Sequence, residues 1–305
     1  MIPLIIGVDH GYASIKTANF VFPTGVTAFD APPPITQGLL EHEGRFYICG
    51  SARQPLLKDK TANESYYLLT LAALAKEVKL RTGCGKADVI IAAGLPLTGF
   101  GKDKAAFRGY LLRHKQPVEF RYETTDYELT ISDAVIYPQG YTAIAANLSI
   151  LGKEPSVVVI DIGGWTVDVM RMDNRMVDTS TCRSLELGVI RCMDEIKEQV
   201  RRTLGMSLTD AQVQAILSNE PCAVGENAKS IVEKHGRLYV ERLLSEINEC
   251  GFDLTALPAV FMGGGASLVK PRVTPTDGLC RPIYIADVCL NAKAFETAVR
   301  QRVAK

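Results

Sequence analysis

The sequence has no excess of charge of either sign and no hydrophobic run long enough to cross a membrane. Its 305 residues include 34 basic and 34 acidic side chains, so the formal net charge is zero. Proteins whose whole surface binds nucleic acid usually carry a strong basic excess. The N-terminal segment MIPLIIGVDHG has no basic start, and Asp9 interrupts its apolar run. We therefore expect no signal peptide, no membrane helix of about 20 apolar residues, and no direct contact with nucleic acid or membrane.

Cysteine and histidine are present, but they form no metal-binding or redox motif along the sequence. None of the eight cysteines belongs to a C-x-x-C motif, and the four histidines are scattered. This usage is typical of a reduced compartment, so we expect a cytoplasmic protein. Apolar residues make up 47% of the chain and charged residues 22%, which is ordinary for a globular protein. The length is about twice the usual 150 residues of one domain and favours two domains.

The first motif that indicates chemistry is D-x-G-x4-K near the N-terminus. Asp9 ends a short apolar run, Gly11 follows in the turn, and Lys16 lies in the next extended segment. An aspartate at the end of a buried strand is placed to hold a hydrated Mg²⁺. Gly11 lets the backbone approach phosphate oxygens, and Lys16 supplies a point charge toward them. The alternative interpretation is a polar hairpin with a surface lysine, and this motif alone does not decide between the two.

A second motif, D-I-G-G-W-T-V-D, repeats the strand, turn and strand pattern in the second half of the chain. Asp161 would face Asp9 across a cleft, Gly163 and Gly164 free backbone amides for an anion, and Thr166 adds a hydroxyl. Asp168 is expected to brace the loop. Trp165, the only tryptophan, is expected to pack against the protein.

A third glycine-rich segment follows the apolar run 258–262. Gly263, Gly264 and Gly265 precede an expected helix and suit the close approach of a nucleoside to a helix N-terminus. A flexible turn is the alternative interpretation, because glycine runs are weak evidence individually. The order of the three loops in the sequence is stronger evidence than any one of them.

Taken together, the three motifs resemble the actin, chaperone and sugar-kinase ATPase superfamily over nearly the whole chain. Within it, the Gly-Arg-Phe-Tyr-Ile-Cys-Gly segment at 44–50, the Gly-Leu-Pro-Leu segment at 94–97 and Pro138-Gln139 resemble the ParM/StbA group of plasmid-segregating bacterial actins. The resemblance implies an α/β actin-like (ribonuclease H-like) fold of two domains, each with a smaller outer subdomain, around a nucleotide cleft. The first predicted domain is 1–153, with an outer subdomain at about 30–86, and the helix 290–305 is expected to pack back on this domain. The second predicted domain is 154–289, with an outer subdomain at about 186–257.

The resemblance also implies roles for individual residues. ATP or GTP with Mg²⁺ would be the ligand, with Asp9 and Asp161 holding the ion through water. Gln139 would orient the attacking water at the start of a helix over 139–151. The expected nucleotide-binding residues are Gly11, Tyr12, Lys16, Gly163, Gly164, Thr166, Lys197, Glu198, Gly263, Gly264 and Gly265. For Lys197 and Glu198 a solvated helix face is the alternative. Trp165 stands where a small residue is usual, and Ala292 and Ala294 stand where a glycine is often found.

The function implied by the resemblance is a polymerising ATPase whose filaments move plasmid DNA. A separate DNA-binding adaptor of the ParR type, bound to a plasmid centromere, would connect filament and DNA, which agrees with the neutral charge of the chain. Two alternatives stay open: a small-molecule kinase of the same fold, and a cytoskeletal scaffold actin with little hydrolysis. A chaperone ATPase is not expected, because no peptide-binding domain follows residue 305.

Locally, the pattern also predicts single secondary-structure elements. We expect one strand over 14–22, a helix over 63–81 stopped by Gly83, strands at 87–93, 118–122, 127–131 and 134–137, and helices over 186–204, 209–217, 226–250 and 291–303.

Overall fold

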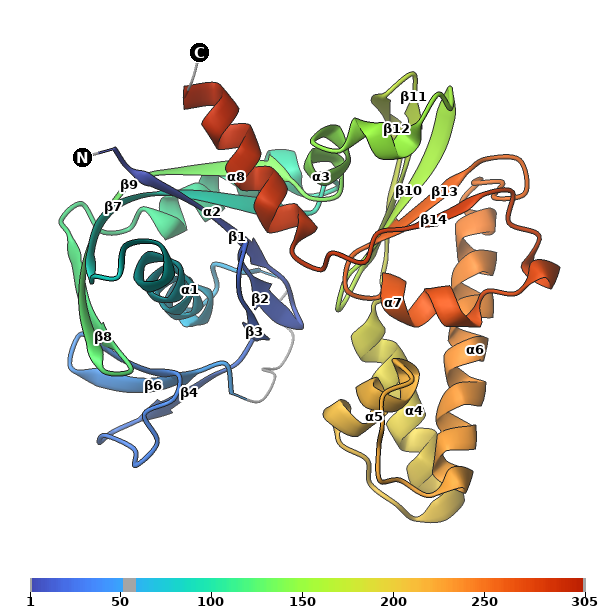
Figure 1. Ribbon diagram of the computed structural model, residues 1–305, viewed down its shortest axis with the longest axis horizontal. Coiled ribbons are helices and arrows are strands. Elements are labelled where there is room, and N and C mark those ends of the chain that lie inside the picture. Colours follow the sequence, from blue (N-terminus) through green and yellow to red (C-terminus); the bar gives the residue numbers. More distant parts are fainter. Residues whose placement is uncertain (1, 52–58, 304–305) are drawn as a thin grey trace. The chain divides into compact units, whose positions relative to one another are not determined.

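The computed structural model describes residues 2–51 and 59–303, which divide into two units. Unit 1 comprises residues 1–147 together with 289–305, and unit 2 comprises residues 148–288. The division falls at 147/148, a few residues before the predicted boundary, and the C-terminal segment belongs to unit 1 (Figure 1). Residues 52–58 of the predicted outer subdomain and 304–305 of the predicted last helix lie outside the described residues.

Unit 1 is built on a mixed sheet that curves around one helix. Its described strands follow the order β3-β2-β1-β7-β9-β8-β5-β6-β4, with β1, β7 and β9 parallel to one another. The bounds are β1 Leu4–His10, β2 Ser14–Lys16, β3 Val21–Pro23, β4 Val26–Phe29, β5 Leu39–His42, β6 Arg45–Cys49, β7 Lys86–Leu95, β8 Val118–Tyr122 and β9 Thr125–Pro138. The helices are α1 Ser65–Thr82, α2 Phe100–Leu111, α3 Tyr141–Ala145 and α8 Leu290–Val303.

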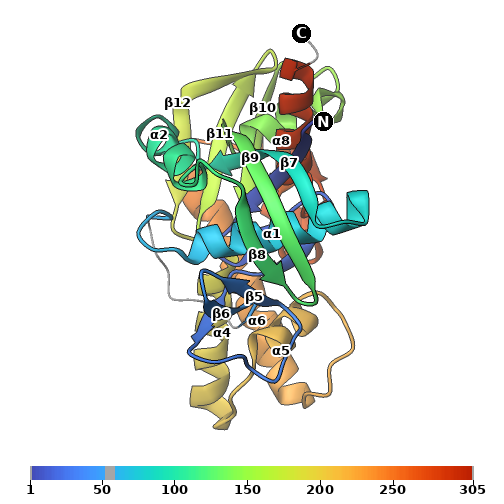
Figure 2. The ribbon, with the colours of Figure 1, turned by 90° about the vertical axis from the view of Figure 1, so that its left-hand side faces the viewer.

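Helix α1 lies on the concave side of this sheet and is apolar on almost every side. Its buried residues run from Tyr66 to Val78, and the strands of the predicted outer subdomain share one core with β1 through it. Figure 1 shows α1 enclosed by the strands, and Figure 2 shows the long strand β9 passing in front of it. A helix apolar all round must be buried, which explains why the sheet curls. Gly83, with a φ of 73°, ends the helix as predicted.

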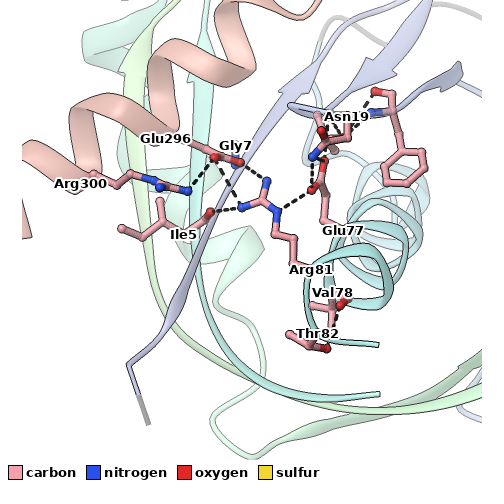
Figure 3. Close-up of polar contacts among 11 residues, drawn as sticks. Ile5, Gly7, Asn19, Glu77, Val78, Arg81, Thr82, Glu296 and Arg300 are labelled. Atoms are coloured by element: carbon pink, nitrogen blue, oxygen red, sulfur yellow. Dashed lines mark hydrogen bonds and ion pairs between the residues drawn. The ribbon is translucent and has the colours of Figure 1, made fainter. Parts of the chain in front are cut away.

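Helix α8 lies against β1 and β7 on the other side of the sheet, where a buried ion network fixes it (Figure 3). Glu296 accepts a hydrogen bond from the backbone N–H of Gly7 at 3.0 Å and binds Arg81 of α1 at 2.5 Å. Arg81 also binds Glu77 at 2.7 Å and the carbonyl of Ile5 at 2.8 Å. A Cβ on Gly7 would overlap the Ala292 backbone, so α8 can approach β1 closely only at a glycine.

Unit 2 combines a five-stranded sheet with a group of helices. The described strands follow the order β12-β11-β10-β13-β14, where β10 is Ser156–Ile162, β11 Val167–Asp173, β12 Met176–Leu185, β13 Ala259–Met262 and β14 Pro282–Tyr284. The helices are α4 Val189–Leu204, α5 Asp210–Leu217, α6 Glu226–Glu249 and the short α7 Ala266–Val269, with 3-10 turns at Leu148–Leu151, Lys270–Arg272 and Pro275–Asp277. Helices α4 and α6 pack side by side, and their apolar faces share the core of the sheet.

Three predictions of secondary structure are wrong in detail. The strand expected over 14–22 is the hairpin of β2 and β3, because Thr17 and Phe20 close a tight turn through the Thr17 N–H to Phe20 carbonyl bond of 2.8 Å. The helix expected over 139–151 is only α3 followed by a 3-10 turn at Leu148–Leu151, because the Asn147 N–H bonds to the Ile144 carbonyl three residues back. The two strands expected at 127–131 and 134–137 form the single strand β9. Of the described helices, none is long and apolar enough to span a membrane.

Candidate functional site

Asp9 and Lys16 of the first motif meet Gln139, which lies 130 residues after Asp9 in the sequence, in unit 1. Asp9 and Lys16 are paired across the antiparallel strands β1 and β2, and Lys16 Nζ lies 3.3 Å from Asp9 Oδ2. Gln139 Nε2 donates a hydrogen bond of 2.8 Å to Asp9 Oδ1. Asp9 is only 3% exposed. Both oxygens of a buried carboxylate are therefore oriented by side chains that reach it from β2 and from the end of β9.

The position of Gln139 is set by the ends of β7 and β9 and by the C-terminal segment. Leu95 and Pro138 are paired at the ends of these strands, and the Gln139 N–H donates to the Leu95 carbonyl at 2.9 Å. The next residue, Gly140, has a φ of 65°, and its N–H donates to Asn291 Oδ1 at 3.1 Å. Asn291 is buried and belongs to none of the three sequence motifs. A polar residue at the start of the last helix was the available signal.

The turn after β1 contains Gly11 and Tyr12. A Cβ on Gly11 would lie 2.6 Å from the Ser14 carbonyl oxygen, and Thr24 Oγ1 donates to the Gly11 carbonyl at 2.7 Å. Lys60 Nζ lies 5.1 Å from the centroid of the Tyr12 ring and donates to the carbonyl of His10 at 2.6 Å. Lys60 is buried and belongs to none of the sequence motifs, so a second lysine beside this turn is not predictable from the sequence.

Directly after Asp9, His10 is fully buried and neutral. Thr70 donates its hydroxyl hydrogen to the Tyr66 carbonyl at 2.6 Å, so the Thr70 oxygen must accept from His10 Nε2, 2.8 Å away. Burial, and next the charge of Lys60, lower the pKa of His10 to about 3. The residue beside Asp9 therefore adds no positive charge at neutral pH, and its ring packs edge-on against Phe107.

In unit 2 the turn after β10 docks on the N-terminus of α4. The Gly163 N–H donates to the Thr166 carbonyl at 2.9 Å and closes the turn. The first N–H groups of the helix segment, those of Gly188, Val189 and Ile190, donate to carbonyls of the turn at 2.8, 3.1 and 2.9 Å. The accepting carbonyls belong to the turn residues Trp165, Gly163 and Gly164 respectively.

This docking orients three consecutive amides of the turn. In a trans peptide the N–H points opposite to the preceding C=O. Because the carbonyls of Gly163, Gly164 and Trp165 point toward α4, the N–H groups of Gly164, Trp165 and Thr166 point away from it. Successive backbone N–H groups of this kind form a nest that binds an anion. The turn therefore offers a phosphate-sized acceptor three donors, whereas the N-terminus of α4 itself is occupied.

Asp161 and the third glycine segment complete the group in unit 2. Asp161 is 8% exposed and lies beside Met262, the last residue of β13, in a parallel pair. Gly263 follows with a φ of 81°, and a Cβ there would overlap the Asp161 carboxylate. The Gly265 N–H donates to the Ile162 carbonyl at 3.0 Å. Glycine at 263 is thus required both by the backbone and by the carboxylate next to it.

Lys197 and Glu198 lie on α4, about 12 Å along the helix from Val189. Lys197 Nζ lies 2.9 Å from Asp194 Oδ1 and 2.5 Å from Asp210 Oδ1. Glu198 binds Arg201 and Arg202 at 2.8 and 2.6 Å, and these hydrogen bonds lower the pKa of its carboxyl. The structure therefore gives Lys197 partners on α4 and α5, and Glu198 partners on α4.

The comparisons with known proteins agree with this arrangement. A family model described as "Actin like proteins N terminal domain" matches residues 7–141, and one described as "Archaeal actin homologue MreB-like, C-terminal" matches residues 159–274. Among curated proteins, none matches the sequence.

Solved structures match over nearly the whole chain. The archaeal actin homolog Ta0583 superposes with a TM-score of 0.78 at 20% identity, over 98% of this chain and 99% of that one. A ParM from a 15-stranded filament of Clostridium botulinum gives 0.79 at 18% identity, over 99% and 100%. The actin-like protein Alp7A gives 0.77 at 14% identity, over 98% and 96%. ParM proteins are therefore among the structural relatives of this chain. Because one family model of actin-like proteins matches unit 1, another matches unit 2, and the fold is actin-like, the chain belongs to the actin-like proteins.

Proposed function

We propose that this chain hydrolyses ATP, that it assembles into filaments in a nucleotide-dependent way, and that these filaments segregate plasmid DNA. The observation that carries the enzymatic part is the hydrogen bond of Gln139 to Asp9, next to Lys16. It joins a water-orienting amide, a carboxylate and a phosphate-binding cation in one unit. The amide nest of Gly164, Trp165 and Thr166 supplies a second, independent anion site in the other unit.

The residues present fit a hydrated Mg²⁺. Asp9 and Asp161 are both buried carboxylates at strand ends, and carboxylate oxygens are the ligands that Mg²⁺ prefers. Because Gly263 has no side chain, the Asp161 carboxylate next to it is not covered from that position. When bound, the ion would neutralise charge on the transferring phosphate.

In this proposal the protein acts by positioning and by electrostatics. Lys16 offers its ammonium to phosphate oxygens, and the nest in unit 2 offers backbone donors whose direction is already fixed by α4. Gln139 orients the attacking water, while Asp9 holds the amide of Gln139 in one orientation. A glutamine is a poor general base, so we expect slow turnover that improves when a neighbouring subunit refines the geometry.

Assembly is supported by the structural relatives. The Clostridium botulinum ParM was solved as a filament, and Ta0583 was also solved in complex with ADP, with a TM-score of 0.76 at 19% identity. We propose by this analogy a bacterial, cytoplasmic protein that polymerises with ATP or GTP and binds a ParR-like adaptor at a plasmid centromere. Its zero net charge agrees with DNA being bound by the adaptor.

The test measures nucleotide binding, phosphate release and sedimentation of the same protein. Gln139→Ala should bind ATP and assemble like the wild type but release phosphate at least about 100-fold more slowly, the cost of one positioned polar group. The matched control is Gln116→Ala, an exposed glutamine of unit 1, which should behave like the wild type. Unchanged phosphate release from Gln139→Ala would remove Gln139 from the mechanism.

Two further measurements separate the alternatives. Asp9→Ala and Asp161→Ala should each weaken the binding of the same Mg·ATP; if one of them leaves the affinity unchanged, that aspartate is not part of the site. Sedimentation with Mg·ATP should yield large polymers, which electron microscopy would show as filaments. A small-molecule kinase would stay small, and a scaffold actin would assemble without releasing phosphate.

A further inference from the structure

A cluster of two histidines and a glutamate lies in unit 1, apart from Asp9 and Gln139. His42 and Glu43 are adjacent at the end of β5, and His114 lies in the connection between α2 and β8. One ligand atom from each of the three side chains lies within 4.8 Å of the other two. Along the sequence these histidines are 72 positions apart and form no motif. Only the fold brings them together.

The hairpin turn between β5 and β6 determines where Glu43 points. Glu43 and Gly44 form a two-residue loop, closed by the pairing of His42 with Arg45, and their φ values are 51° and 72°. A two-residue loop with two positive φ values usually contains asparagine or aspartate before glycine. A glutamate there adopts a backbone conformation that L-residues rarely take. Its carboxylate Oε1 lies 4.0 Å from His42 Nε2.

The environment of His42 fixes which of its nitrogens is available. His42 Nδ1 lies 3.4 Å from the carbonyl of Glu119 on β8, so a neutral ring donates Nδ1–H there and keeps the lone pair on Nε2. A metal-binding histidine typically has its second nitrogen bonded to a backbone carbonyl or carboxylate in this way.

Arg113 does not compete with a cation for the cluster. Arg113 directly precedes His114, but its guanidinium lies 4.3 Å from the ring centroids of Tyr67 and Tyr110 and pairs with Glu64 at 3.0 Å. The ring of His114 packs against Tyr67 at 5.5 Å and against His42 at 6.0 Å. His114 is thus held beside His42 by aromatic packing.

We propose that His42, Glu43 and His114 bind a transition-metal dication, for which Zn²⁺ is the physiological candidate. Two imidazoles and one carboxylate are a zinc ligand set, whereas Mg²⁺ and Ca²⁺ prefer oxygen ligands alone. Ligand atoms of a tetrahedral zinc site lie about 3.3 Å apart, given bonds of about 2.0–2.1 Å. To close to that value, Glu43, whose side chain is 66% exposed, and the half-buried His114 would have to rotate inward. Water completes the fourth position.

The bound ion would join the β5–β6 turn to the connection that precedes β8. These segments are distant in the sequence, and β5 and β8 pair through only a short register, Leu40 with Tyr122 and Glu41 with Arg121. A ligand that binds the folded protein alone stabilises it by mass action. The site would therefore act as a structural or regulatory clamp on this edge of unit 1, independently of the proposed ATPase function.

The test uses the full chain without nucleotide, with the exposed cysteines removed as Cys84→Ser and Cys280→Ser so that they do not bind metal. Calorimetric titration with ZnCl₂ should show one saturable site. His114→Gln should weaken binding by at least about 100-fold, and Glu43→Gln, in an exposed turn, by about 10-fold. The matched control is His235→Gln, a partly exposed histidine on α6, which should bind as tightly as the parent.

Two further readouts show whether these side chains are the ligands. Co²⁺ should give visible bands typical of imidazole and carboxylate ligation, without a thiolate charge-transfer band. A Zn²⁺ concentration about 100-fold above the Kd should raise the Tm of the parent by roughly 5 °C or more and that of His114→Gln by no more than about 2 °C. No saturable binding in the parent, equal affinity in His114→Gln, or a thiolate band would each overturn the proposal.

Discussion

Replacing Glu296 should loosen the attachment of α8 to the strand that carries Asp9. Glu296 is 7% exposed, and its carboxylate accepts from the Gly7 N–H and from Arg81. The change Glu296→Gln removes the charge but keeps an oxygen that can accept from Gly7. Arg81 keeps its second partner, Glu77, so the guanidinium is not left without a counter-charge.

The magnitude follows from which interactions are lost. A hydrogen bond to a charged group contributes about 1.5–3 kcal/mol, so Glu296→Gln should cost about 2 kcal/mol of the free energy of unfolding of unit 1. Glu296→Ala should cost about 3–5 kcal/mol, because it also leaves the Gly7 N–H and half of the Arg81 guanidinium without an acceptor. The control is Arg300→Gln: Arg300 lies 3.3 Å from the same carboxylate, but its side chain is 62% exposed. An exposed ion pair contributes at most about 1 kcal/mol.

Hydrogen exchange of the native protein, read by mass spectrometry on peptides from β1 and α8, measures this locally. A loss of about 2 kcal/mol should raise the exchange rate of protected β1 amides by about 30-fold, since 1.4 kcal/mol corresponds to tenfold. Peptides from α6 in unit 2 should exchange as before. If β1 exchanges at the wild-type rate in Glu296→Gln, or if Arg300→Gln accelerates it equally, the buried network is not what holds α8.

Three other outcomes are expected. Because the folded-state pKa of His10 is about 3 and the unfolded one about 6.5, only the unfolded chain binds the extra proton between these values, and stability should fall by up to about 5 kcal/mol as the pH drops from 6.5 to 3. In His10→Gln the free energy of unfolding should fall less steeply with pH on acid titration, and an equal slope would contradict the assignment. Thr209→Ala should lower the free energy of unfolding of unit 2 by about 1 kcal/mol, since Thr209 forms a capping box at the start of α5, whereas Thr209→Ser should lower it little. Denaturant unfolding followed by the fluorescence of the only tryptophan measures this, and equal stability of both variants would contradict it. By the same assay, Gly188→Ala should cost about 1–3 kcal/mol, because its Cβ would overlap the backbone of Trp165 and Gly164. Gly225→Ala, at the equivalent cap of α6 with nothing within 4 Å, should be nearly neutral, and similar losses in both variants would show that the overlap at Gly188 is relieved at little cost.

The sequence by itself determined the first turn, two helix ends and most of the long helices. Asp9 and Lys16 could be placed opposite each other because a turn between two short strands fixes the register of its flanks, and the structure pairs them. Gly83 and Thr209 could be read as helix ends because capping depends on neighbours within four residues. The family followed from the order of three glycine loops, which survives in sequence even at about 20% identity to the solved relatives.

The tertiary structure decided every contact between distant segments. Gln139 reaches Asp9 from 130 residues away, Asn291 fixes Gly140 from 151 away, and Glu296 holds Gly7 from 289 away. No periodicity or capping rule contains such pairs, because they arise when the parallel order of β1, β7 and β9 brings strand ends to one edge and α8 returns to β1. His42 and His114, scattered in the chain, become neighbours for the same reason. The break at Thr17 and Phe20 also depends on a distant partner, since Glu77 of α1 binds Asn19 inside that turn (Figure 3).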